Sequence, residues 1–340
     1  MNGSIFAYSR TGSALAKAIA DALPGAWRLY TVARLAEGPF QAMPAGTREF
    51  YGERFARSDA LIFIGACGIA VRAIAPFVRD KRTDPAVLCV DELGRFVIPL
   101  LSGHIGGAND LARVLADQIG AVSVVTTATD VHRRFSVDAW AARNGLTIDN
   151  MQAAKAVSAA ILEGAVPLKS DFPIATGLPA GVVAGQTGAV GIYLTAGLHR
   201  PFGTTLRLIP RVLHLGIGCR KGVAAQAVAQ AVRQVLSEAG LEERAVKCAA
   251  SIDLKAREPG LLEYCREAGI PIRFYAAETL MAVEGSFTAS EFVKKTTGAD
   301  NVCERAAMVG AGRLLVKKTA LEGVTVAVAA ENWEAHFENG

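Results

Sequence analysis

The stretch SGHIGGAND, residues 102–110, combines a proton-exchanging side chain with an unusual share of small residues. Its candidate chemistry rests on Ser102, His104 and Asn109, with Gly106 and Gly107 between them. Histidine changes charge most readily near neutral pH, so His104 is the expected general base. The glycines let a ligand approach the backbone, where Ser102 and the neighbouring amides could donate hydrogen bonds. The structural alternative is that Asn109 caps a helix and that His104 is held by its own hydrogen bonds.

Other apolar runs also end in polar, glycine-containing loops. In α/β sheets, ligands collect beyond the carboxyl ends of strands, and helix N-terminal amides favour anions. The predicted binding residues are Gly68, Arg72, Lys81 and Arg82, then Thr127 and Asp130, and in the C-terminal half Gly218, Cys219, Arg220, Lys221, Ser251 and Lys255. Asp253 and Glu258, in the same C-terminal loops, are candidate proton donors. Each loop also has a structural explanation, as a tight turn or a helix cap.

Several common site types do not fit the sequence. Residues 216–222 follow the spacing G-x-G-x-x-x-G, whereas a dinucleotide turn needs G-x-G-x-x-G. This spacing counts against a nucleotide-binding oxidoreductase, which stays open as an alternative. A G-x-S-x-G elbow is missing, which disfavours a serine hydrolase of the α/β type. The five histidines show no ligand spacing with cysteine or carboxylate, so we expect no metal site.

The elements that must position these residues alternate between strands and helices. Residues 59–68 form a near-continuous apolar run, typical of a strand buried on both faces. Residues 86–101 predict two strands joined by a turn, and residues 313–330 predict a hairpin. The expected architecture is two three-layer α/β domains, residues 1–140 and 210–333, joined by a small, less regular middle region, residues 141–209.

Composition limits the partners and the setting. The 340 residues are 51% hydrophobic and 20% charged, so the chain can bury a core. A net charge of +4 without a polybasic tract argues against nucleic acid and suits a small acidic substrate. We find no apolar stretch long enough to cross a membrane and no signal peptide. The six cysteines are scattered, which favours a reduced, cytoplasmic protein.

Longer strings make the chain recognisable. GIAVRAIAPFVRDKRTDPAV, LLSGHIGGANDLA, TTATDV, GIGCRKG and SIDLKAREPGLLEYC closely resemble the cobalt-precorrin-5A hydrolase family of anaerobic cobalamin biosynthesis. The resemblance covers nearly the whole chain and is weakest in the middle region. It implies an enzyme that opens a δ-lactone on a cobalt-bound, ring-contracted tetrapyrrole and releases acetaldehyde. It also implies that the substrate supplies its own cobalt, and that neighbouring enzymes of the pathway are partners.

The roles of single residues follow from the chemistry of that reaction. Lactone opening needs a base that activates water and donors for the developing oxyanion. We assign His104 as the base, Ser102 as a donor and Asn109 as a residue that orients them. Asp253 or Glu258 would supply a proton when acetaldehyde leaves. A non-catalytic tetrapyrrole carrier of the same pathway remains the alternative.

Overall fold

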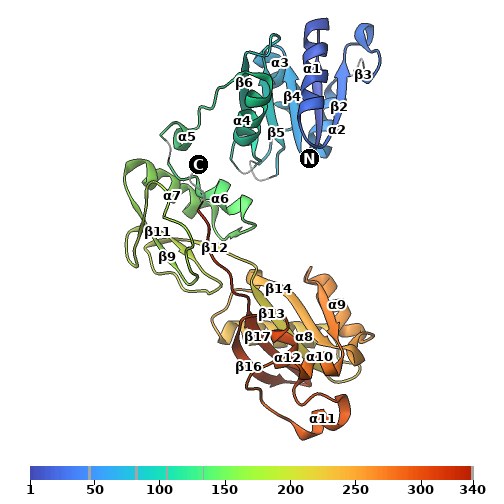
Figure 1. The fold of residues 1–340 in the computed structure, drawn as a ribbon, viewed down its shortest axis with the longest axis vertical. Coiled ribbons are helices and arrows are strands. Elements are labelled where there is room, and N and C mark those ends of the chain that lie inside the picture. Colours follow the sequence, from blue (N-terminus) through green and yellow to red (C-terminus); the bar gives the residue numbers. More distant parts are fainter. Residues whose placement is uncertain (45–46, 81–82, 105, 133, 338–340) are drawn as a thin grey trace. The chain divides into compact units, whose positions relative to one another are not determined.

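The computed structural model describes residues 1–44, 47–80, 83–104, 106–132 and 134–337. It divides the chain into two compact units, Met1–Trp140 and Ala141–Gly340. The described residues form three sheets with helices packed on them (Figure 1), so the predicted α/β fold is confirmed. No helix among the described residues is long and apolar enough to cross a membrane.

The first unit contains a seven-stranded sheet, counted over the described residues, in the order β3-β2-β1-β4-β5-β6-β7. Its strands are β1 (Asn2–Ala7), β2 (Ala26–Thr31), β3 (Phe40–Ala42), β4 (Ala60–Ile64), β5 (Ala86–Val90), β6 (Phe96–Leu101) and β7 (Val122–Ser123). Its helical elements are α1 (Arg10–Ala22), η1 (Ala33–Leu35), α2 (Thr47–Arg57), α3 (Cys67–Ile74), α4 (Ala108–Ile119), α5 (Ala128–Val131) and the first residues of α6 (Val137–Arg143).

Helices cover both faces of this sheet. Ile5 points to one face, where α1 and α4 supply buried residues such as Ile19 and Leu115. Phe6, the next residue of β1, points to the other face and packs with Phe55 of α2. Successive strand residues point to opposite faces, so a strand between two helical layers is apolar throughout. The near-continuous apolar runs in the sequence therefore have a direct explanation.

Strand β6 reverses direction, and this decides where its loop lies. β1, β2, β4 and β5 pair in parallel, but β6 runs antiparallel to β5 and β7 runs parallel to β6. The β5–β6 connection is the turn that the sequence predicts, with Gly94 at a φ of 68°. The carboxyl end of β6 consequently lies at the amino edge of the parallel strands.

The second unit begins with a sheet that is more regular than its Gly-, Pro- and Thr-rich sequence suggests. The strands are β8 (Thr147–Ile148), β9 (Val166–Ser170), β10 (Val182–Ala184), β11 (Val190–Leu194) and β12 (Thr204–Ile209), ordered β10-β9-β11-β12-β8. Helix α7 (Met151–Glu163) has a buried face formed by Ala154, Val157 and Ile161. Some of the glycines serve close packing, since a Cβ on Gly191 would lie 2.5 Å from the Phe202 ring.

The C-terminal sheet has the order β15-β14-β13-β17-β16. Its strands are β13 (Leu213–Cys219), β14 (Val246–Ile252), β15 (Ile272–Tyr275), β16 (Arg313–Leu321) and β17 (Val324–Ala330), the last two forming the predicted hairpin. One face packs against α8 (Ala225–Glu238) and α9 (Pro259–Glu267), and the other against α12 (Val302–Met308). Shorter elements are η2 (Glu243–Ala245), η3 (Asp253–Lys255), α10 (Ala277–Met281) and α11 (Glu291–Thr297).

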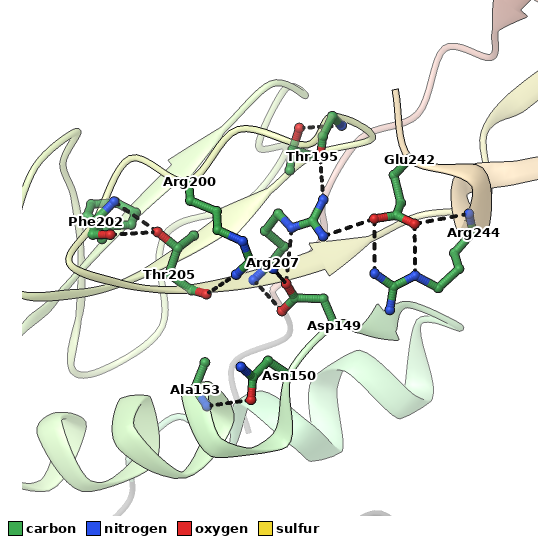
Figure 2. Close-up of polar contacts among 11 residues, drawn as sticks. Asp149, Asn150, Ala153, Thr195, Arg200, Phe202, Thr205, Arg207, Glu242 and Arg244 are labelled. Atoms are coloured by element: carbon green, nitrogen blue, oxygen red, sulfur yellow. Dashed lines mark hydrogen bonds and ion pairs between the residues drawn. The ribbon is translucent and has the colours of Figure 1, made fainter. Parts of the chain in front are cut away.

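A buried guanidinium ties the two sheets of the second unit together (Figure 2). Arg207 of β12 bonds Asp149 at 3.0 Å and, with its other end, Glu242 at 2.9 Å. Its third contact is the carbonyl oxygen of Gly197, at 2.7 Å. The Asp149 side chain is 0% exposed and that of Arg207 is 5% exposed. Burial of the charges leaves each dependent on its partners.

The chain end makes a second connection. After β17, the C-terminal segment (residues 331–337) returns to the connection between β9 and β10. Ala335 pairs with Ile174, and Phe337 exchanges two hydrogen bonds with Thr176. Trp333 packs edge to face on Phe172. The last described residues thus complete a part of the fold that begins more than 150 residues earlier.

Gly216 lies inside β13 and serves packing, not a nucleotide turn. A Cβ at this position would lie 1.7 Å from the carbonyl oxygen of Cys303, because α12 crosses the strand there. We expect Gly216→Ala to lower the free energy of unfolding by about 1–3 kcal/mol, the usual cost of overpacking a core. Urea unfolding of both proteins measures this. Gly164→Ala is the matched control because that site has open space, and equal effects of the two changes would contradict the packing explanation.

Candidate active site

The structure brings His104 into contact with two carboxylates. Its Nε2 lies 2.9 Å from Oδ2 of Asp130, and its Nδ1 lies 3.3 Å from Oδ1 of Asp138. The Thr129 hydroxyl lies 3.2 Å from Nε2. Asp130 and Thr129 belong to α5, in the loop that follows β7. Because β6 and β7 run parallel, the two loops that follow them lie at the same edge of the sheet.

The carboxylate of Asp130 is the centre of a wider polar cluster. It accepts a hydrogen bond of 3.0 Å from the side-chain amide of Asn109 and forms an ion pair with Arg113. Burial opposes its ionisation, but Arg113 and then His104 lower the pKa of Asp130. The predicted residues His104, Asn109, Thr127 and Asp130 therefore gather in one place, since Asn109 also bonds the Thr127 hydroxyl.

The acidic partner Asp138 was missed by the sequence reasoning. It lies in the first turn of α6, where an acidic residue already has a helical explanation. Its Oδ1 accepts hydrogen bonds from the Ser136 hydroxyl and the Ala139 amide, at 2.9 and 3.1 Å. The only available signal was position: Asp138 lies eight residues after Asp130, shortly beyond the TTATDV loop that was singled out.

The electrostatics of His104 differ from those of a free base. Burial favours its neutral form, but the hydrogen bonds to Asp138 and Asp130 outweigh burial and raise the pKa of His104. A raised pKa increases the share of His104 that carries a proton at any given pH. The geometry therefore suits proton donation better than the proton abstraction that the sequence suggested.

Ser102 has a structural task that the sequence did not show. Its hydroxyl donates to the carbonyl oxygen of Asp84 at 2.9 Å, and the residue is 8% exposed. Its φ is 57°, in the left-handed region that residues other than glycine rarely adopt. A Cβ on Gly106 would lie 2.3 Å from the Ser102 Cβ, so this glycine permits the tight turn. Gly107 has a φ of 76° and open space around it.

The first residues of α4 correct two expectations. Gly107, not Asn109, is the N-cap, and Asn109 reaches across to the α5 loop instead. The backbone amides of Ala108 and Asn109 donate to the carbonyl oxygens of Ser102 and Gly103. The backbone amide of Gly107 donates to the carbonyl oxygen of His104. The loop therefore satisfies these helix amides itself, and they are not open to an incoming anion.

The loop of Gly68 and Arg72 lies at the other edge of the sheet. The Gly65 amide bonds the last residue of β5, Val90, whereas Ser102 bonds Asp84, just before β5 begins. A five-residue strand spans about 16 Å, so these two loops do not form one site. Arg72 instead contacts the Gly68 carbonyl oxygen at 3.3 Å. Lys81 and Arg82 lie outside the described residues.

The C-terminal candidates gather at the carboxyl edge of β13 and β14. Glu258 accepts a hydrogen bond of 2.6 Å from the Gly222 amide and pairs with Lys255 at 3.1 Å. Burial opposes its ionisation, but these contacts lower the pKa of Glu258, which makes it a poor proton donor. Burial raises the pKa of Cys219, the last residue of β13.

The other predicted residues at this edge fall into two groups, those buried within the sheet and those exposed to solvent. Ser251 is fully buried and donates to the Ile217 carbonyl oxygen at 2.6 Å, so it holds β14 to β13. Gly218 accepts from Thr325 at 3.2 Å, within the sheet. Arg220, Lys221 and Asp253 are exposed. The exposed charges are the ones that a ligand can reach directly.

Comparison with known proteins identifies the family. Two family models match, Cobalamin synthesis G N-terminal over residues 49–130 and Cobalamin synthesis G C-terminus over residues 213–329. A cobalt-precorrin-5A hydrolase from Salmonella typhimurium is 35% identical over 338 residues, 95% of this chain and 96% of that protein. The chain belongs to the cobalt-precorrin-5A hydrolase family.

A second relative of that name also matches over most of its length. The protein of that name from Priestia megaterium is 33% identical over 321 residues, covering 86% of this chain and 84% of its own. A crystal structure of a cobalamin biosynthesis protein G homologue from Sulfolobus solfataricus covers 97% of both chains, with 22% identity and a TM-score of 0.41. The two family models and the two hydrolases confirm the resemblance inferred from the sequence.

The matched regions of this cobalt-precorrin-5A hydrolase family member contain the C-terminal cluster and most of the cluster around His104. The N-terminal model includes His104 and Asp130 and ends before Asp138. The C-terminal model includes the edge formed by residues 218–258. Among the described residues, no three His, Cys, Asp or Glu side chains are placed to hold a metal ion.

A pocket of about 1010 Å³ lies in the second unit, outside both clusters. Asp171, Glu331 and Glu334 line it together with Arg313. Carboxylates outnumber basic groups in this lining, which disfavours a polycarboxylate ligand. We therefore treat the two clusters of polar loops, one in each unit, as separate candidate sites in preference to this pocket.

Proposed function

We propose that this protein is a cobalt-precorrin-5A hydrolase, which opens the δ-lactone of a cobalt-bound, ring-contracted tetrapyrrole and releases acetaldehyde to give cobalt-precorrin-5B. The observation that carries the proposal is the match to a relative of that name along 95% of this chain. Water cleaves the lactone to a carboxylic acid and an alcohol. The alcohol then loses its proton and becomes the carbonyl of acetaldehyde as its carbon–carbon bond breaks. The electron pair of that bond passes to the conjugated macrocycle, which takes up a proton as acetaldehyde leaves. The substrate brings its own cobalt.

The cluster at His104 supplies the proton chemistry in this proposal. His104 is the proton-transfer group, and its contacts with Asp130 and Asp138 support that role. Asn109 acts through Asp130, which it holds in place. Ser102 fixes the loop through Asp84, so its proposed role becomes one of shaping the site. Gly106 and Gly107 keep the loop backbone free of side chains.

The exposed basic side chains at the carboxyl edge of β13 are proposed to bind substrate carboxylates. Arg220 and Lys221 are exposed and precede α8, whose N-cap makes no side-chain hydrogen bond. Lys255 is paired with Glu258 and contributes less free charge. Gly218, Cys219, Ser251 and Asp253 complete this edge, and Arg72 with Gly68 is proposed as a separate contact in the first unit.

Replacing Arg220 and Lys221 by alanine should weaken tetrapyrrole binding. Two exposed charge contacts contribute about 1–2 kcal/mol together, so Kd rises roughly 5- to 30-fold. Because salt screens exposed charges, wild-type affinity also falls with ionic strength, and the variant loses part of that dependence. Absorbance titration at two salt concentrations measures both. Arg233→Ala with Arg266→Ala, on the exposed faces of α8 and α9, is the matched control; equal losses would remove this loop from the site.

Turnover tests the proposed function directly. The purified protein is mixed with cobalt-precorrin-5A, and acetaldehyde is measured with an alcohol dehydrogenase and NADH. Acetaldehyde in proportion to consumed substrate supports the hydrolase. Tight binding of the tetrapyrrole without acetaldehyde would instead make the protein a carrier of the same pathway.

The setting proposed for this activity is the cytoplasm, with neighbouring enzymes of the pathway as partners. All six cysteines are free thiols, as expected in a reducing compartment.

A further inference from the structure

His104 differs from an ordinary loop histidine in the partners of its two ring nitrogens. Nδ1 faces Asp138 and Nε2 faces Asp130. A neutral imidazole has one N–H and one lone pair, so one of these carboxylates would face a lone pair. An imidazolium donates from both nitrogens and satisfies both contacts.

Both carboxylates are held in a form that accepts hydrogen bonds. Asp138 Oδ1 accepts from Ser136 and from the Ala139 amide. Asp130 accepts from Asn109 and is paired with Arg113, which also bonds Asp110 at 2.9 Å. Donors therefore surround both oxygens of Asp130 and Oδ1 of Asp138, which act as acceptors. The proton between these groups therefore belongs on the imidazole.

We propose that Asp138 is a positioning residue that, together with Asp130, holds His104 as an imidazolium cation, so that His104 acts as a proton donor. The part of this inference that concerns catalysis rests on the proposed function. Asp138 keeps the Nδ1 proton in place. When a substrate oxygen replaces Asp130 as the acceptor of the Nε2 proton, Nε2 gives its proton to that oxygen and Asp130 keeps its contacts with Asn109 and Arg113. Solvent then returns a proton to Nε2, so the step needs no oxidant or reductant.

The charge of His104 can be measured without any turnover. Histidine labelled with ¹³C at Cε1 gives one NMR signal for each of the five histidines, and His104→Gln assigns the signal of His104. In the wild-type protein this signal should titrate above the ordinary histidine pKa of about 6.5. Asp138→Asn and Asp130→Asn should each move its midpoint down. Asp117→Asn, an exposed carboxyl on α4, should leave it unchanged.

Two results overturn the inference. One is a wild-type His104 that titrates at or below the ordinary value, which needs no variant and does not depend on how the variants fold. The other is a midpoint that Asp138→Asn leaves in place. Failure to release acetaldehyde would contradict only the proposed function. The inference about the charge of His104 would still be decided by the titration.

The pH profile of turnover adds a readout that a merely structural Asp138 would not move. A proton donor loses activity as pH rises through its pKa. The alkaline limb of the wild-type profile should therefore follow the NMR midpoint of His104. In Asp138→Asn the limb should shift to lower pH together with that midpoint, and a limb that stays in place contradicts the positioning role.

Discussion

Replacing His104 by glutamine should lower the rate of acetaldehyde release by about 10²–10⁴-fold, the usual contribution of a positioned acid or base. Glutamine keeps a hydrogen-bond donor beside Asp130 and Asp138 but cannot transfer a proton. Substrate affinity should change little, because the predicted binding charges lie elsewhere. The measurement is single-turnover acetaldehyde release, with tetrapyrrole binding and thermal unfolding recorded on the same preparation.

His132→Gln is the matched control for this prediction. His132 follows α5 immediately and is exposed, so its replacement should preserve the rate. If His104 were only a structural residue, His104→Gln would melt at lower temperature while each folded molecule kept its wild-type rate. That pattern would end the catalytic assignment of His104.

Replacing Arg207 by methionine should lower the free energy of unfolding of the second unit by about 3–5 kcal/mol. The change leaves the fully buried Asp149 and the 9% exposed Glu242 without the cation between them. Hydrogen bonds from Arg244, and further from Arg207, lower the pKa of Glu242 to about 2, so this carboxylate stays charged at neutral pH. Urea unfolding followed by circular dichroism measures the loss.

Arg200 offers a comparison within the same cluster. It bonds the same Asp149 at 2.6 Å, but its side chain is 48% exposed. Arg200→Met should therefore cost about 1 kcal/mol or less, the range of exposed ion pairs. Similar losses for the two replacements would show that burial does not decide the strength of this connection.

Local patterns were sufficient for much of the fold. The apolar run at 59–68 and the helical spacing of Leu111 and Leu115 reflect strands and helices that pack on both sides of one sheet. The middle region was harder, because residues such as Gly191 and Gly203 occur both in loops and in tightly packed strands. In this fold they allow close packing against Phe202 and Ala189, and only the tertiary neighbours distinguish the two uses.

The sequence identified the polar loops of the candidate site but not which of these loops lie next to each other. His104 and Asp130 were both singled out, but their contact depends on β6 and β7 running in the same direction. The predicted turn between β5 and β6 reverses the chain, so the loop after β6 lies at the opposite edge from Gly68, which was wrongly expected near the same ligand. Asn109 satisfied the rule for a helix cap, and nothing local revealed its longer reach to Thr127.

The C-terminal segment has a consequence for how the protein is made. Ala335 and Phe337 are buried against residues 174–176. During synthesis, the ribosome must add about 160 more residues after residue 176 before these partners emerge, and chain elongation at 5–20 residues per second makes that interval roughly 10–30 seconds. Until then, the apolar surface around Phe172, which Trp333 covers in the folded protein, stays exposed in the nascent chain. Slow translation of the second half of the message should therefore increase the dependence of the protein on chaperones.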